Sequence, residues 1–175
     1  MSKALDYIEE VGQIVEELEK LRFMPVLVGG MALVILGSRR VTRDFDFLVS
    51  TENSERESLL NVFYKRGFEL ASRVNKDGDV IRTIDSQKVA AVRLRLDNPL
   101  NIHFLNRQTG LRIDLLFDFP CPASEIASRS KKKKIRSYTF RVASKADLLR
   151  LKEIAYKDRS LAVDAQDLEF LKKFL

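Results

Sequence analysis

Residues 26–49 have the sequence VLVGGMALVILGSRRVTRDFDFLV, and this stretch decides the predicted fold. Its first three residues are apolar, which predicts a short buried strand, and residues 31–36 predict a helix directly after it. Gly29 and Gly30 therefore fall at a strand-to-helix turn. Glycine allows the backbone N–H groups there to approach a phosphate closely, and a helix N-terminus favours an anion. The turn is thus a candidate phosphate-binding site.

A second predicted strand carries two acidic residues at alternate positions. Asp44, Phe45, Asp46 and Phe47 begin the run DFDFLV, and side chains alternate between the two faces of a strand. Both carboxylates are therefore expected on one face, with the phenylalanines in the core. Two carboxylates on one face repel each other unless a cation lies nearby, and divalent cations prefer such oxygen ligands. The alternative is an ordinary tight turn followed by two surface residues on an edge strand.

The combination resembles the polymerase-β-like nucleotidyltransferase superfamily, in which a glycine turn is followed at about this distance by Asp-x-Asp between hydrophobic residues. The resemblance implies transfer of a nucleoside monophosphate from a nucleoside triphosphate to a hydroxyl, with release of pyrophosphate, at a two-metal Mg²⁺ site. Such a site usually needs a third carboxylate. Asp114, within RIDLLF at residues 112–117, matches the third motif of the superfamily. Asp118 is the alternative third ligand, because it lies an even number of residues from Asp114 and would point to the same face of a strand. The implied catalytic and metal-binding residues are Asp44, Asp46 and Asp114.

The polar link between the predicted helix and the second strand offers further phosphate contacts. Ser38 is a hydrogen-bond donor, and Arg39, Arg40 or Arg43 would neutralise phosphate charge. A solvated loop is the alternative for all four. The predicted nucleotide-binding residues here are Gly29, Gly30, Ser38 and Arg43.

The C-terminal residues carry a second, narrower resemblance, to the AbiEii-type nucleotidyltransferases of abortive-infection systems. It rests on DLLRLK at residues 147–152, KDR at 157–159 and DAQDL at 164–168. In that group a lysine of the first helix lies near the nucleotide and an aspartate of the last helix supports it, which implies Lys152 and Asp167 here. It also implies a toxin–antitoxin context with an antitoxin protein as partner. Ordinary solvated helix faces are the alternative.

Composition limits the class of protein. The 175 residues carry a formal charge of +6, with a pI near 9.5, which favours polyanionic partners such as nucleoside triphosphates or RNA. No apolar run approaches the length that spans a membrane, so no membrane partner is expected. Cys121 is the only cysteine, which excludes an internal disulfide and a cysteine-rich zinc site. We therefore expect a cytoplasmic protein.

The remaining pattern predicts an α+β fold, with a mixed β-sheet core flanked by helices and followed by C-terminal helices. We expect one domain over residues 1–175, with its core at about 23–120 and its helical part at about 144–175. Residues 89–96 alternate well enough to predict a strand. Ser144 and Asp147 predict a capped helix start. His103, the only histidine, is not expected to form a metal site.

The acceptor of the transferred nucleotide stays open at this stage. A transfer RNA end, a protein side chain or a small molecule would each supply a hydroxyl, and the lysine run at residues 131–134 slightly favours RNA. That run is otherwise a solvated loop. The alternatives to an enzyme are a non-catalytic module that binds nucleic acid and a sensor that holds a nucleotide without turnover.

Overall fold

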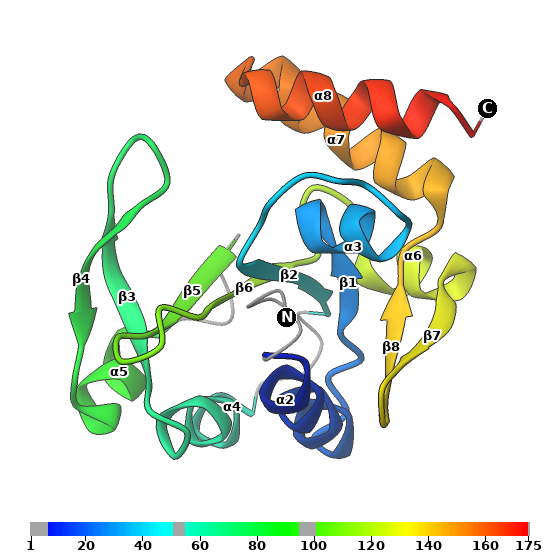
Figure 1. The fold of residues 1–175 in the computed structure, drawn as a ribbon. Helices are drawn as coiled ribbons and strands as arrows, with labels where there is room; N and C mark the ends of the chain where they lie inside the picture. Colours follow the sequence, from blue (N-terminus) through cyan, green and yellow to red (C-terminus); the bar gives the residue numbers. More distant parts are fainter. Residues whose placement is uncertain (1–6, 51–54, 95–100, 175) are drawn as a thin grey trace.

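The structure is a computed structural model that describes residues 7–50, 55–94 and 101–174 (Figure 1). Its elements, in chain order, are α2 (Ile8–Lys20), β1 (Val26–Val28), α3 (Gly29–Ile35), β2 (Asp44–Val49), α4 (Arg56–Tyr64), β3 (Phe68–Val74), β4 (Val80–Ile84), α5 (Gln87–Arg93), β5 (Asn101–Asn106), β6 (Arg112–Phe117), α6 (Ala123–Arg129), β7 (Lys131–Ile135), β8 (Tyr138–Val142), α7 (Lys145–Arg159) and α8 (Ala162–Lys172).

All eight of these strands join one mixed sheet, in the order β4-β3-β5-β6-β2-β1-β8-β7. The pairs β2/β6 and β1/β8 are parallel, and the other pairs are antiparallel. The strands that carry the glycine turn and the predicted carboxylates, β1, β2 and β6, are therefore neighbours in the middle of the sheet. This arrangement confirms the predicted α+β class.

Helices cover the sheet because each presents an apolar stripe to it. In α2 the buried residues recur at helical spacing, and the helix packs against the sheet beside α4 (Figure 1). The core between these layers contains large side chains that are almost fully inaccessible, among them Phe45 and Phe47 of β2. The prediction that these two phenylalanines turn inward, opposite the aspartates, is thus confirmed.

The C-terminal helices α7 and α8 lie side by side on the opposite side of the sheet from α2 and α4 (Figure 1). The predicted cap of α7 is present, since the Ser144 hydroxyl accepts a hydrogen bond from the Asp147 N–H at 3.1 Å. Asp147 also receives two hydrogen bonds from Arg129 of α6, which fastens the start of α7 to the core. Among the described helices, none is both long and apolar enough to cross a membrane.

Two predicted segments differ from the structure. The strand predicted over residues 89–96 is wrong, because α5 occupies residues 87–93, where Ser86 caps the helix by accepting a hydrogen bond from the Val89 N–H. Residues 95–96 lie outside the described part of the chain. The lysine run predicted as a loop forms the exposed edge strand β7. Lysines on an edge strand hinder pairing with other chains, so this run also has a structural role.

Candidate active site

The glycine turn packs directly against the carboxylate strand. Gly29 has φ +69°, a conformation that side chains rarely adopt, and a Cβ at this position would collide with the Asp46 carboxylate. A Cβ on Gly30 would lie 2.7 Å from the guanidinium carbon of Arg40. Glycine is therefore required at position 29 by its backbone conformation and by Asp46, whereas at position 30 the Arg40 side chain would have to move to admit a Cβ.

The register of the sheet places the three predicted carboxylates together on β2 and β6. In the parallel pairing Asp46 lies opposite Asp114, and Asp44 lies opposite Arg112. Val28, the residue before the glycine turn, lies opposite Asp46 on the other side. The two strands thus place Asp46 and Asp114 side by side, next to the strand that leads into the turn.

Crowding of negative charge changes the ionisation of this pair. Burial, together with the nearby charges of Asp114 and Asp44, raises the pKa of Asp46 from its ordinary 3.8 to about 8. Burial alone also raises the pKa of Asp114, but hydrogen bonds from His103 and Arg112 outweigh it and hold the pKa of that carboxyl below its ordinary value. Burial and the neighbouring charges therefore favour the neutral form of Asp46, whereas the hydrogen bonds favour the charged form of Asp114.

Asp114 is held by two basic residues that sequence reasoning did not assign to the site. Its Oδ1 lies 2.8 Å from His103 Nδ1 on β5 and accepts a hydrogen bond from Arg112 Nε at 2.8 Å. Arg112 Nη2 also lies 3.0 Å from His103 Nδ1, and Nη1 donates to the backbone oxygen of Gly78 in the β3–β4 turn. His103, which was not expected to form a metal site, thus borders the candidate site.

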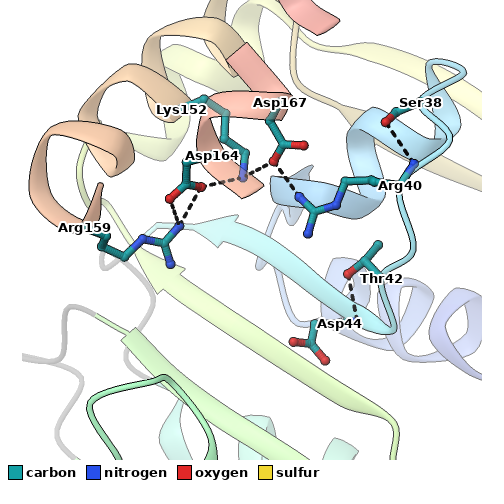
Figure 2. Close-up of polar contacts among 8 residues, drawn as sticks. All are labelled: Ser38, Arg40, Thr42, Asp44, Lys152, Arg159, Asp164 and Asp167. Carbon is teal, nitrogen blue, oxygen red and sulfur yellow. Dashed lines mark hydrogen bonds and ion pairs between the residues drawn. The ribbon is translucent and has the colours of Figure 1, made fainter. Parts of the chain in front are cut away.

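A chain of buried ion pairs joins the C-terminal helices to this region (Figure 2). Lys152 Nζ of α7 lies 2.9 Å from Asp167 Oδ2 and 3.4 Å from Asp164 Oδ1 of α8. Arg40 Nη1 donates to the same Asp167 oxygen at 2.5 Å, and Arg159 donates to both oxygens of Asp164. Asp164 and Asp167 are only 0% and 2% exposed, and buried carboxylates need such partners.

This chain of contacts brings positive charge close to the acidic pair. Lys152 and Asp46 line the same pocket, and the charge of Lys152 lowers the pKa of Asp46 slightly against the larger effects that raise it. Arg40 lies over Gly30, and its Nε atom is buried without a hydrogen-bond partner among the residues that the structure describes. The site therefore presents two cations on the side where the glycine turn lies.

The donor chemistry of the three aspartates fits a hard divalent cation, because carboxylate oxygens are its preferred ligands. Burial and the charges of Asp114 and Asp44 raise the pKa of Asp46, so a cation bound beside it would favour its ionised form. Within residues 7–50, 55–94 and 101–174, no three or more histidine, cysteine, aspartate or glutamate side chains already form a metal-ligand group. The carboxylates therefore suit a metal by their chemistry and would have to turn toward it when it binds.

A pocket of about 420 Å³ opens beside the acidic pair. One part of its wall is polar and includes Gly29, Asp46, Asp114 and Lys152. The rest of the wall includes the basic residues His103, Arg112 and Arg159, together with apolar side chains from α7 and from the residues that follow β6. Pockets of this size hold small ligands.

Comparison with known proteins identifies the family. A family model described as the nucleotidyl transferase AbiEii toxin of type IV toxin–antitoxin systems matches residues 12–174. The chain belongs to this family. It is accordingly a nucleotidyltransferase, as the glycine turn and the Asp-x-Asp strand predicted. None of the curated protein sequences that were compared matches it significantly.

Solved structures show the same fold as this AbiEii-family chain. A nucleotidyltransferase-like antigenic protein from Paracoccidioides brasiliensis is 14% identical, with 95% of this chain and 75% of that chain covered and a TM-score of 0.58. JHP933 from Helicobacter pylori is 19% identical, with coverages of 99% and 67% and a TM-score of 0.52. The lincomycin-bound lincosamide adenylyltransferase LnuA is 12% identical, with coverages of 100% and 98% and a TM-score of 0.55.

The other residues that were predicted for this AbiEii-family site lie around it in different ways. Ser38 accepts a hydrogen bond from the Arg40 N–H at 3.3 Å, so it shapes the link before β2. Arg43 is exposed, whereas Arg40 reaches the glycine turn. The rival ligand Asp118 accepts a hydrogen bond from the Ala123 N–H at 2.7 Å, at the start of α6.

Proposed function

We propose that this chain transfers a nucleoside monophosphate from a nucleoside triphosphate to an acceptor hydroxyl and releases pyrophosphate. The observation that carries the proposal is the juxtaposition of Asp46, Asp114 and Gly29 beneath Lys152 in one pocket. The carboxylates of Asp46 and Asp114 suit a metal ion. The glycine turn and the Lys152 ammonium group, which lie beside them, suit a triphosphate.

The chain's own residues then have separate tasks. The backbone at Gly29 and Gly30 and the charges of Arg40 and Lys152 would hold the β- and γ-phosphates, and so stabilise the departing pyrophosphate. Asp167 supports this arrangement, because its Oδ2 contacts both cations. Ser38 and Arg43 remain our secondary proposals for phosphate contacts.

The three aspartates would bind Mg²⁺, with Asp44 and Asp46 on the nucleotide side and Asp114 on the acceptor side. When bound, the metal would neutralise phosphate charge and lower the pKa of the attacking hydroxyl. The acceptor oxygen would form a bond to the α-phosphorus and give up its proton with the help of Asp114, as the bond to the bridging oxygen of pyrophosphate breaks. Arg112 and His103 position Asp114 through the contacts described above.

For the acceptor we propose RNA, supported by the exposed lysines of β7. The register pairs Lys131 with Val142, and Ala143, the next residue, donates a hydrogen bond to the Leu27 oxygen of β1. The basic edge therefore begins at the end of the sheet where the glycine turn lies, two strands away. The family description also supports a cognate antitoxin as a protein partner.

The experiment is label transfer from each α-³²P nucleoside triphosphate to total RNA or to protein, with Mg²⁺ and pyrophosphate measured in parallel. We expect labelled RNA, which is lost in Asp44→Asn and Asp46→Asn and retained in Glu153→Gln, an exposed change next to Lys152. Labelled protein without labelled RNA would refute the RNA acceptor alone. Absence of both products, together with no metal-dependent nucleotide binding, would refute the proposed reaction.

A further inference from the structure

The apolar part of the pocket lining comes from two segments that are far apart in the chain. Phe119 and Pro120, which follow β6, form one apolar surface, and Leu151, Ile154 and Ala155 of α7 form the other. Phe119 is 41% exposed although it is a large apolar side chain. Single exposed apolar residues are common on protein surfaces, but here they gather around one pocket.

The sheet register locates Phe119 relative to the acidic pair. Val28, Asp46 and Asp114 form one row across β1, β2 and β6, with Gly29 just beyond Val28. The next row on the same face contains Leu116, about 7 Å further along β6 at the usual rise of a strand. Phe119 follows at that end. Phe119 and the glycine turn thus lie toward opposite sides of the carboxylates, and the α7 residues line the same pocket as both.

A nucleoside triphosphate also has a polar end and an apolar end. Its anionic β- and γ-phosphates lie on one side of the α-phosphate, and its planar base lies on the other. With the tail on the glycine turn and the α-phosphate at the carboxylates, the base would reach the surfaces formed by Phe119 and α7. The pocket's 420 Å³ lies in the lower part of the range for sites that hold one small ligand, about 300–1,000 Å³. It therefore has room for the nucleotide, and the acceptor would approach from outside.

From this placement we infer that Phe119, Pro120 and the α7 residues Leu151, Ile154 and Ala155 form the nucleobase subsite. The inference rests on the proposed function, because it takes the triphosphate site as given. Every base has a π-face that stacks on an aromatic ring, so this subsite holds the base by stacking and apolar contact. The polar lining residues Asn101, Asp158 and Arg159 are exposed, and His103 and Arg112 are engaged with Asp114. All four bases should therefore bind with similar affinity.

The test is calorimetric titration of the whole chain, in Mg²⁺, with ATP, GTP, CTP, UTP and inorganic tripolyphosphate. Stacking of one base is typically worth about fivefold to a hundredfold in affinity. We expect each nucleotide to bind more tightly than tripolyphosphate by a factor in this range. Phe119→Ala should remove most of that advantage and leave tripolyphosphate binding unchanged, while Phe119→Tyr should keep it. Phe174→Ala is the matched control, because Phe174 is 43% exposed and does not line the pocket.

Several outcomes would overturn the inference. If tripolyphosphate and the nucleotides bind equally to the wild type, the base makes no contact and only the base subsite fails. If Phe119→Ala lowers label transfer but leaves nucleotide affinity unchanged, the surface belongs to the acceptor. A preference above about a hundredfold for one base would contradict recognition by stacking alone. If neither tripolyphosphate nor any nucleotide binds, the proposed function fails together with the subsite.

Discussion

Replacing Asp46 by asparagine should stabilise the metal-free protein while abolishing its activity. Asp46 is half-buried beside Asp114 and Asp44, and their charges together with burial raise its pKa to about 8. The unfolded chain ionises this group near pH 3.8, so the folded state binds more protons between about pH 4 and pH 8. Stability attributable to this group is therefore greatest below pH 4 and is lost as the pH rises toward 8. Asparagine is neutral at every pH and escapes this loss.

The magnitude follows from the pKa. A pKa that moves from 3.8 to about 8 corresponds to about 5–6 kcal/mol for an isolated group. Asp46 titrates together with Asp114, whose pKa moves the other way, so we take about half of this value. Asp46→Asn should then raise the free energy of unfolding by about 2–3 kcal/mol at pH 8.5 and by less than about 1 kcal/mol at pH 4.5. At pH 8.5 this is a rise in Tm of about 5–10 °C.

The assay is urea and thermal unfolding in a chelating buffer at both pH values. Asp77→Asn, in the exposed β3–β4 turn, is the matched control and should show no such difference. A variant that is less stable than the wild type at pH 8.5, or that differs from it equally at both pH values, would refute the argument. Either result would mean that Asp46 is not held neutral by its acidic neighbours.

Three further predictions concern the metal, the helical part and the glycine turn. Binding of Mg²⁺ should displace the proton of Asp46, so the affinity for Mg²⁺ should rise up to tenfold per pH unit until about pH 8. Calorimetry in buffers of different ionisation enthalpy would measure the proton release. Arg40→Ala and Asp167→Asn should be non-additive by about 1–3 kcal/mol in urea unfolding, because they share one buried ion pair; additivity would show that the pair contributes nothing. Gly29→Ala should lose triphosphate binding and be more destabilised than Gly37→Ala, since both have positive φ but only a Cβ on Gly29 meets a neighbour within 4 Å. Equal unfolding midpoints for the two glycine variants would contradict the steric argument.

The sequence predicted those features of the site that follow from residues close together in the chain. Gly29 and Gly30 mark a turn because glycine tolerates the backbone found there, and the alternation of residues 44–49 places two acids opposite two phenylalanines. Ser144 likewise predicts a helix start from one side chain and a backbone N–H three residues on. Such features depend on residues close together in the chain, so one sequence is sufficient to find them.

The missed residues depend on the register in which strands pair. His103 lies opposite Asp114 only because β5 pairs with β6 in one register, and Arg112 lies opposite Asp44 only because β6 runs parallel to β2. A shift of one residue would turn either side chain to the other face. Arg112 and Asp114 are two residues apart on one predicted strand, so the sequence already indicated that their side chains share a face. Nothing local distinguished His103.

The error over residues 89–96 has a similar cause. Short apolar segments fit a strand or a helix about equally well, and length and flanking residues must decide between them. Ser86 was the deciding residue, since its side chain caps α5. Val92, an apolar residue within the predicted strand, is largely exposed in the helix.

The charged residues of the site are paired with one another in the metal-free protein. Asp114 is paired with Arg112 and His103, and Asp167 with Arg40 and Lys152. These pairs satisfy buried charges that would otherwise be strongly destabilising. A metal and a triphosphate would bring the opposite charges to the same groups, the cation to the acids and the phosphates to the bases. Ligand affinity is therefore set by the difference between the new contacts and the internal pairs that they weaken, and not by the number of charges around the pocket.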